Sequence, residues 1–258
     1  MVRLYDHPKH YDIAFSWDMA REVGFLRSLF RRHVRSPVKR ILEPCCGTGR
    51  FMVQLPGYGF HVTGYDLSAP MLAYARRRIR SAGLQGRARV VRADMRTARF
   101  SPRFDAALNS INSFAYLLTD EDVLAHLRAT ADSLKPGGVY VIHMSCAHRR
   151  TPGPDSEGWV QERDGVSVHT FWSIDKQDRR RKLSLQTSRM RIRDHGQRFT
   201  LTSHHIQRLW LHGDWRAIID VSGRFRLAAV YRDDYRHVPA STVITGEMGN
   251  HYYVLRAI

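Results

Sequence analysis

The stretch ILEPCCGTGR, residues 41–50, decides how this chain folds. An apolar run of strand type ends there in an acid, Glu43, and a turn containing Gly47 and Gly49 leads into a helical pattern. Glycines in such a turn let a ligand come close to the backbone, and the helix that follows offers free N–H groups. The stretch therefore predicts a strand–turn–helix unit with a ligand site at the turn.

Two more acids follow at the ends of the next apolar runs. Asp66 ends the run 61–66, with Leu67 directly after it, and Asp94 directly follows the run 88–93. Because the carboxyl ends of parallel strands meet at one edge of a sheet, we expect Glu43, Asp66 and Asp94 to face one crevice. An acid at the end of the second strand is suited to accept hydrogen bonds from ribose hydroxyls, which is the role expected of Asp66.

Short apolar runs alternate with helical patterns from residue 39 to 144. This alternation predicts an α/β fold with a doubly wound, mainly parallel sheet. An apolar stripe from Met19 to Phe30 predicts one more helix ahead of it. The expected strands are 40–43, 61–66, 88–93, 104–109 and 139–144, and the expected helices lie near 48–55, 69–80 and 120–134.

After Ser145 the pattern changes to strands without intervening helices, which predicts an antiparallel flap. A helix from Asp214 to Val221 and two final strands then complete the chain. We therefore expect an N-terminal helical cover (1–38), a main domain (39–146 and 211–258) and the flap (147–210). The expected late strands are 159–163, 166–174, 182–193, 198–210, 225–231 and 252–256.

The composition limits the classes of protein. With 43% hydrophobic and 25% charged residues, the chain is expected to fold into a globular protein. No apolar run approaches the roughly 18 residues that span a bilayer, and the N-terminus lacks the apolar stretch of a signal peptide, so we expect no membrane association. The cysteines Cys45, Cys46 and Cys146 form no disulfide framework, which favours a cytoplasmic location. No CxxC pair is present and His204-His205 are the only adjacent histidines, so no metal site is expected.

The net charge of +17, from 41 basic and 24 acidic residues, favours anionic partners without naming one. A solvated basic surface is the simplest interpretation of it. Nucleic acid is an alternative partner on the same ground.

With these residues in place, the sequence between 39 and 145 resembles the class I S-adenosylmethionine-dependent methyltransferases. The resemblance implies a Rossmann-like, seven-stranded sheet and S-adenosylmethionine as cofactor, with S-adenosylhomocysteine as product. Cys45 stands where that family most often has its first glycine. The resemblance assigns the cofactor to the turn residues Glu43, Cys45, Gly47 and Gly49, to Asp66 with Leu67, to the adenine-contacting pair Asp94-Met95, and to Asn109.

Both ends of the chain are similar to small-molecule N- and O-methyltransferases of the glycine and amino-sugar type. Those enzymes have an N-terminal cover with a Tyr-Asp pair, which resembles Tyr11-Asp12 here, and an antiparallel flap. The resemblance implies that Tyr11 helps to close the cofactor pocket. It also implies methyl transfer to a nitrogen or oxygen of a small-molecule acceptor.

Two residues are candidates for a catalytic role, His143 at the end of the strand 139–144 and Tyr116 after the strand 104–109. A histidine titrates near neutral pH and can accept a proton from an amine or hydroxyl. Two other functions stay open: a methyltransferase acting on RNA or DNA, and a non-catalytic protein that binds S-adenosylmethionine. Pairing of two copies through the flap is a further expectation, because flap strands have exposed edges.

Overall fold

The computed structural model describes residues 4–145, 156–242 and 250–258. Its main sheet has eight strands in the order β11-β10-β12-β5-β4-β1-β2-β3. The strands from β3 to β5 run parallel, whereas β12 is antiparallel to both of its neighbours. The strands are β1 (Arg40–Pro44), β2 (His61–Asp66), β3 (Ala88–Arg92), β4 (Phe104–Asn109), β5 (Leu134–Ser145), β10 (Phe225–Arg232), β11 (His237–Val238) and β12 (Asn250–Ala257).

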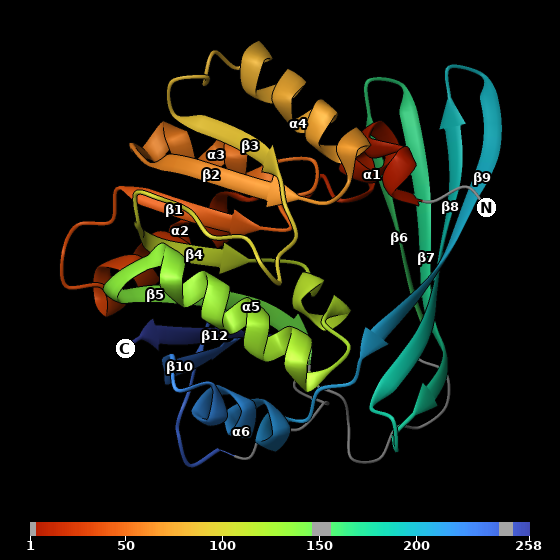
Figure 1. The fold of residues 1–258 in the computed structure, drawn as a ribbon. Coiled ribbons are helices and arrows are strands. Elements are labelled where there is room, and N and C mark those ends of the chain that lie inside the picture. The colour runs from red at the N-terminus through yellow and green to blue at the C-terminus, as the bar shows by residue number, and fades with distance from the viewer. Residues whose placement is uncertain (1–3, 146–155, 243–249) are drawn as a thin grey trace.

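The helices pack on both faces of this sheet (Figure 1). Side chains of α2, α3 and α4 share one apolar cluster with one face of the strands, and α5 and α6 share a second cluster with the other face. The helices are η1 (Leu4–Asp6), α1 (Pro8–Ala14), α2 (Ala20–His33), α3 (Arg50–Gln54), η2 (Leu55–Tyr58), α4 (Ala69–Ser81), η3 (Ser113–Tyr116), α5 (Asp120–Ser133) and α6 (His212–Ser222).

Local sequence explains where the helices beside the site begin. The hydroxyl of Ser68 accepts a hydrogen bond from the Met71 N–H, and Pro70 lies in the first turn of α4. The hydroxyl of Thr119 accepts one from the Asp122 N–H at the start of α5, as its capping-box spacing predicts. Both helices therefore start directly after loops at the carboxyl edge of the sheet.

A second, four-stranded antiparallel sheet forms the flap, in the order β6-β7-β8-β9. Its inner face packs against η1 and α1 through apolar side chains such as Val168, Met190 and Leu201. The flap stands opposite the carboxyl ends of β1, β2 and β4 (Figure 1). The strands are β6 (Ser156–Arg163), β7 (Val166–Asp178), β8 (Leu183–Asp194) and β9 (Gln197–Arg208).

The expected fold class is confirmed, with three differences in detail. The main sheet has an eighth strand, β11, which is only two residues long and carries no periodic signal. Strand β7 runs on to Asp178, beyond the end expected at residue 174, because a bulge between Ile174 and Lys176 lets the ladder continue. The third difference is α1, which the apolar pattern of the sequence did not predict. The domain boundary expected at 146/147 falls outside the described residues, and the three-part division stays a proposal.

Candidate functional site

The turn between β1 and α3 has a left-handed backbone at three positions. Cys45, Gly47 and Gly49 have φ values of 56°, 50° and 76°. A Cβ atom on Gly49 would lie 3.0 Å from the Cβ of Ala75 on α4, so this position is tight as well as left-handed. A Cβ on Gly47 would meet no atom within 4 Å, so the backbone there faces open space that a ligand can occupy.

Asp66 is fixed beside this turn by backbone amides. Its Oδ2 accepts a hydrogen bond of 3.0 Å from the Gly47 N–H, and its Oδ1 accepts one of 2.8 Å from the Ser68 N–H. Burial raises the pKa of Asp66, and the hydrogen bonds from these amides partly oppose that rise. The carboxylate is therefore oriented before any ligand arrives.

Cys45 shows that the three expected acids converge. Its Sγ lies 3.4 Å from the Sδ of Met95, across the site from the glycine turn. Burial raises the pKa of the Cys45 thiol, and the carboxylates of Asp66, Asp94 and Glu43, in that order, raise it further. A single side chain thus lies within electrostatic reach of all three strand-end acids.

The other expected cofactor residues lie around the same edge with partners of their own. Asp94 forms an ion pair of 2.6 Å with Arg96, whose hydrogen bonds lower the pKa of Asp94. The buried Asn109 donates a hydrogen bond of 3.2 Å from Nδ2 to the Pro44 carbonyl and so supports the turn. The side chain of Leu67 is 57% exposed at the rim. Their contacts with a cofactor stay predictions.

Glu43 supplies an unused buried acceptor. It is 3% exposed, its Oε2 has no hydrogen-bond partner, and burial raises its pKa well above the usual value. A buried unpaired carboxylate oxygen is costly unless a ligand satisfies it. Together with the oriented carboxylate of Asp66 and the open space at Gly47, it fits the expected S-adenosylmethionine, which carries an ammonium group and a ribose diol.

The N-terminal cover is fastened to the site through Asp12 on α1. Its carboxylate, 2% exposed, forms ion pairs of 2.5 Å with Arg78 on α4 and 2.7 Å with Arg163 on β6. It also accepts hydrogen bonds from the hydroxyls of Thr48 (3.0 Å) and Tyr74 (3.2 Å). Asp12 therefore joins the cover, the flap, α4 and the glycine turn.

Tyr11, its neighbour, lies in a group of aromatic side chains. Its ring centroid lies 4.5 Å from that of Phe15 and 5.7 Å from that of Tyr5. Burial raises the pKa of Tyr11, and the nearby Arg50 opposes the rise. The position is consistent with the expected role in closing the pocket.

Tyr116 on η3 meets the flap. Its hydroxyl lies 2.9 Å from Nδ1 of His205 on β9 and 2.7 Å from the hydroxyl of Tyr5. Burial lowers the pKa of His205 and raises that of Tyr116. His205 is therefore neutral at pH 7, with a ring nitrogen beside the Tyr116 hydroxyl.

His143 on β5 has other partners. Its Nε2 lies 2.9 Å from Oδ1 of Asp233, and its ring stacks on Tyr252 at 4.2 Å. The two candidate catalytic side chains, His143 and Tyr116, thus belong to different hydrogen-bonded groups.

Two residues of this region were not among the expected site residues. His205 lies on the inner face of the flap because side chains alternate along β9. Its neighbour His204 points to the outer face. The alternation of side chains along the expected strand 198–210 could have shown that only one of the two histidines faces inward. Arg50, the first residue of α3, is a charge placed directly after the glycine turn.

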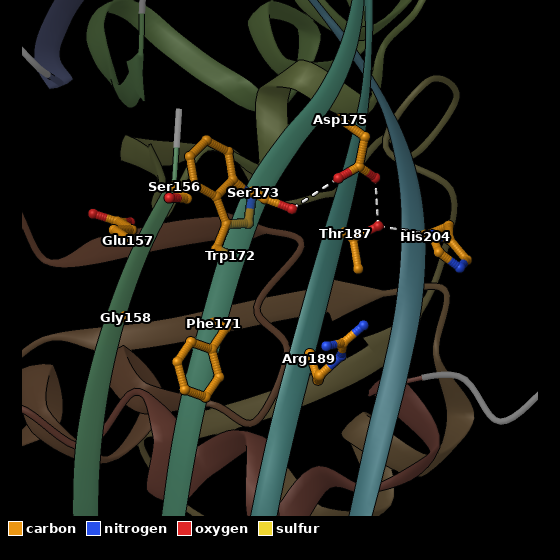
Figure 2. A pocket seen from close by; sticks show the side chains of 10 residues that line it. All are labelled: Ser156, Glu157, Gly158, Phe171, Trp172, Ser173, Asp175, Thr187, Arg189 and His204. Atoms are coloured by element: carbon orange, nitrogen blue, oxygen red, sulfur yellow. Dashed lines mark hydrogen bonds between the residues drawn. The ribbon is translucent and has the colours of Figure 1, made fainter. Parts of the chain in front are cut away.

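The outer face of the flap carries a separate hollow of about 430 Å³ (Figure 2). On its wall the Thr187 hydroxyl bridges a carboxylate oxygen of Asp175 and Nδ1 of His204. This hollow lies on the side of the flap opposite to His205, so it is separate from the acids at the carboxyl edge of the main sheet. Among the described residues no group of three or more metal-ligating side chains occurs. None of the helices in the described ranges is long and apolar enough to cross a membrane.

Comparison with known sequences identifies methyltransferases as relatives of this chain. The family described as "Methyltransferase domain" matches residues 41–138. The chain is 31% identical over 171 residues to a dTDP-3-amino-3,4,6-trideoxy-alpha-D-glucopyranose N,N-dimethyltransferase of Streptomyces venezuelae, a match that covers 63% of this chain and 67% of that enzyme. It is 36% identical over 153 residues to a dTDP-3-amino-3,6-dideoxy-alpha-D-glucopyranose N,N-dimethyltransferase of Streptomyces fradiae, covering 58% of this chain and 56% of that enzyme.

Comparison with solved structures supports the same fold over the whole chain. DesVI of Streptomyces venezuelae superposes with a TM-score of 0.77 at 21% identity, covering 99% of this chain and 98% of the other. CalS10, an amino pentose methyltransferase from Micromonospora echinaspora solved with S-adenosylmethionine bound, superposes with a TM-score of 0.73 at 21% identity, covering 100% and 98%.

Proposed function

The chain belongs to the class I S-adenosylmethionine-dependent methyltransferases, and from this premise we propose that it methylates the amine of an amino sugar carried on a nucleoside diphosphate. The observation that carries the proposal is the meeting of Tyr116 and His205 between the cofactor edge and the flap. When bound, the cofactor supplies an activated methyl group on sulfur.

The relatives support the choice of acceptor. The two sugar enzymes from Streptomyces are named for N,N-dimethylation of dTDP-amino sugars, and their matches run beyond the family's own segment of 41–138. The net charge of +17 suits the attraction of an anionic diphosphate to this surface.

The loop after β4 supports a proposed position for the acceptor. Ile111 and Asn112 have left-handed φ values of 50° and 56°, a strained conformation of the kind that often marks a functional turn. The Nδ2 of Asn112 donates a hydrogen bond of 3.0 Å to Oε1 of Gln207 on β9, which holds this loop against the flap. An acceptor bound between the loop and the flap lies beside both Tyr116 and the cofactor edge.

The Tyr116–His205 pair suits amine chemistry. An amine attacks a methyl group only in its neutral form, and the methylated product must lose a proton. The proton passes to His205, which is neutral at pH 7, directly or through the Tyr116 hydroxyl. Alignment of the two reactants and exclusion of water by the cover and flap supply the remainder of the acceleration.

Binding and turnover test the proposal separately. Isothermal titration with S-adenosylhomocysteine is expected to give saturable one-to-one binding. Methyl transfer from labelled S-adenosylmethionine is expected with a dTDP-amino sugar and not with the matching dTDP-sugar that has a hydroxyl in place of the amine. Transfer to the hydroxyl sugar, or to RNA with a steep dependence on salt, would overturn the choice of acceptor.

Two further expectations belong with this proposal. We place the enzyme in the cytoplasm, where the free thiols of Cys45 and Cys46 remain reduced. Pairing of two copies through the flap stays a prediction that the molar mass in solution tests.

A further inference from the structure

The outer face of the flap carries a row of arginines without acidic partners. Arg189, Arg191 and Arg193 lie at alternate positions of β8, so they point to the same face of the sheet. All three are exposed, and among the described residues none of them forms an ion pair. Together with the net charge of +17, this row favours the approach of an anion to the outer face.

The hollow of Figure 2 lies at the Arg189 end of this row and has an aromatic wall. Its volume of about 430 Å³ is within the range of roughly 300–1,000 Å³ that is usual for small-molecule sites. The ring of Phe171 is 43% exposed, lies across the ladder from Arg189, and packs over Gly158, where a Cβ would come within 3.3 Å of the ring. A ring fixed in this way offers a contact surface to a flat apolar group.

A β-bulge shapes the polar side of the hollow. Asp175 has no cross-strand partner, because it lies at the bulge between Ile174 and Lys176. Its carboxylate accepts hydrogen bonds from the hydroxyls of Thr187 and Ser173, and these lower the pKa of Asp175. Asp175 is therefore ionised at neutral pH and has a hydrogen bond on each oxygen.

The same hydrogen bonds orient His204. Since the ionised Asp175 can only accept, the Thr187 hydroxyl donates to it and accepts from the Nδ1–H of His204, 2.8 Å away (Figure 2). The Nε2 of His204 has no partner among the described residues, and neither has the guanidinium of Arg189. A neutral imidazole can accept the proton of a singly ionised phosphate, and an imidazolium can donate to the doubly ionised form.

We propose that this hollow binds a phosphorylated molecule of the nucleotide class, with its phosphate on Arg189 and His204 and its flat ring against Phe171. A planar guanidinium suits two oxygens of a phosphate. The acid Glu157 also lines the hollow, but it lies on the edge strand β6, whereas Arg189 and His204 lie on β8 and β9. The site is on the face of the flap opposite to His205, so it is distinct from the acceptor and cofactor sites of the proposed function.

The test uses three probes that separate the two halves of such a ligand. Thymidine 5′-monophosphate, thymidine and inorganic phosphate are titrated by calorimetry into protein saturated with S-adenosylhomocysteine. The variants are Arg189→Gln, Phe171→Ala and the matched control Arg193→Gln, which removes the same charge from the same strand and face outside the hollow. The imidazole C–H signal of His204 in NMR spectra, identified by its absence in His204→Gln, reports on the hollow itself.

Thymidine 5′-monophosphate should bind more tightly than thymidine or phosphate and should shift the His204 signal with the same dissociation constant. Arg189→Gln should weaken this binding by about 10- to 100-fold, the effect of losing hydrogen bonds from a charged group. Phe171→Ala should weaken it by about 3- to 10-fold through the lost ring contact. Arg193→Gln should stay within about twofold of the wild type.

Other outcomes overturn the inference in recognisable ways. Inorganic phosphate that binds as tightly as thymidine 5′-monophosphate would make the hollow a simple anion site. Binding that survives Arg189→Gln and leaves the His204 signal unmoved would lie elsewhere, for example at the acceptor site. An equal loss in Arg193→Gln would indicate general attraction to a basic face, and no binding at all would remove the site. None of these outcomes bears on S-adenosylhomocysteine binding or methyl transfer, which Arg189→Gln should leave unchanged.

Discussion

Asp12 on α1 and Arg163 on β6 form an ion pair of 2.7 Å that fastens the N-terminal cover to the flap. The same carboxylate also pairs with Arg78 and accepts the Thr48 hydroxyl, so one side chain sets the relative position of cover, flap and glycine turn. The glycine turn, to which the cofactor is expected to bind, adjoins this junction through Thr48. The charge of Asp12 therefore bears on both stability and ligand binding.

Replacing Asp12 by Asn should destabilise the protein markedly. The variant leaves Arg78 and Arg163 without their counter-charge, and breaking a buried pair costs about 3–5 kcal/mol, reduced here to about 2–3 because the arginine side chains are 25% and 35% exposed. The free energy of unfolding in urea measures the loss.

A matched control is available on α5. Asp132 also pairs with two arginines, Arg99 and Arg224, and its side chain is 32% exposed. Asp132→Asn should cost less than about 1 kcal/mol, as exposed pairs do. Equal losses in the two variants would contradict a special role for the junction at Asp12.

Cofactor affinity should decrease as the pH is lowered, because Asp66 takes up a proton. Burial raises the pKa of this carboxylate, so it takes up a proton at a higher pH than the roughly 3.9 of an exposed aspartate. In the ribose-binding role predicted for Asp66 the ionised form accepts the hydroxyls, so affinity for S-adenosylhomocysteine should decline as the pH falls through this raised value. The folded state binds that proton more tightly than the unfolded chain, so the same protonation favours folding.

Titrations across acidic and neutral pH check these opposite trends. Asp66→Asn should bind more weakly at pH 7, by about 1.5–3 kcal/mol for the lost hydrogen bonds to a charged group, and should lose the part of the pH dependence that comes from Asp66. A wild type with the same pH dependence as Asp66→Asn would remove Asp66 from the ribose site.

The sequence was sufficient to predict that the three acids lie at one edge of the sheet. Glu43, Asp66 and Asp94 each end an apolar run, and strand direction alone brings such residues to one side. The glycine turn could also be predicted, because its residues lie next to one another in the chain.

Contacts between segments that are distant in the chain could not be predicted from the sequence in this way. His205 meets Tyr116 only because the flap folds back over the sheet, across 89 positions of sequence. Asp12 was noted as part of a Tyr-Asp pair, but its arginine partners lie on α4 and β6. The absence of a hydrogen-bond partner for NH1 and NH2 of Arg50 depends on packing, which a single sequence does not record.

Cys45 should tolerate glycine. Its φ of 56° lies in the left-handed region, which costs an L-residue about 1–2 kcal/mol, and glycine avoids that cost while losing about 0.5–1 kcal/mol through its freer unfolded chain. Cys45→Gly should therefore raise the free energy of unfolding by no more than about 1.5 kcal/mol and leave S-adenosylhomocysteine affinity unchanged.

Valine at the same position is the contrasting variant. A β-branched residue is a genuine outlier there, so Cys45→Val should destabilise the fold and weaken binding. A gain of tenfold or more in affinity for Cys45→Gly would show instead that the native thiol restricts the cofactor, which would favour the non-catalytic alternative.

Replacing His205 and replacing His143 should have different effects on kcat. His205 is neutral and lies 2.9 Å from the Tyr116 hydroxyl, whereas the Nε2 of His143 is engaged by Asp233. His205→Gln should lower kcat by about 10²-fold or more, the contribution of a positioned proton acceptor, with an unchanged dissociation constant for S-adenosylhomocysteine. His143→Gln should keep kcat within about threefold of the wild type on the same ground.

The pH profile distinguishes this role from a structural one. Because burial lowers the pKa of His205, protonation of its imidazole should add an acidic limb below the usual histidine value of about 6.5, beside the limb that protonation of the acceptor amine produces in every variant. The limb from His205 should vanish in His205→Gln, while Tyr116→Phe keeps it at a lower kcat. Loss of activity in His143→Gln with a normal His205→Gln would transfer the proton-accepting role to His143.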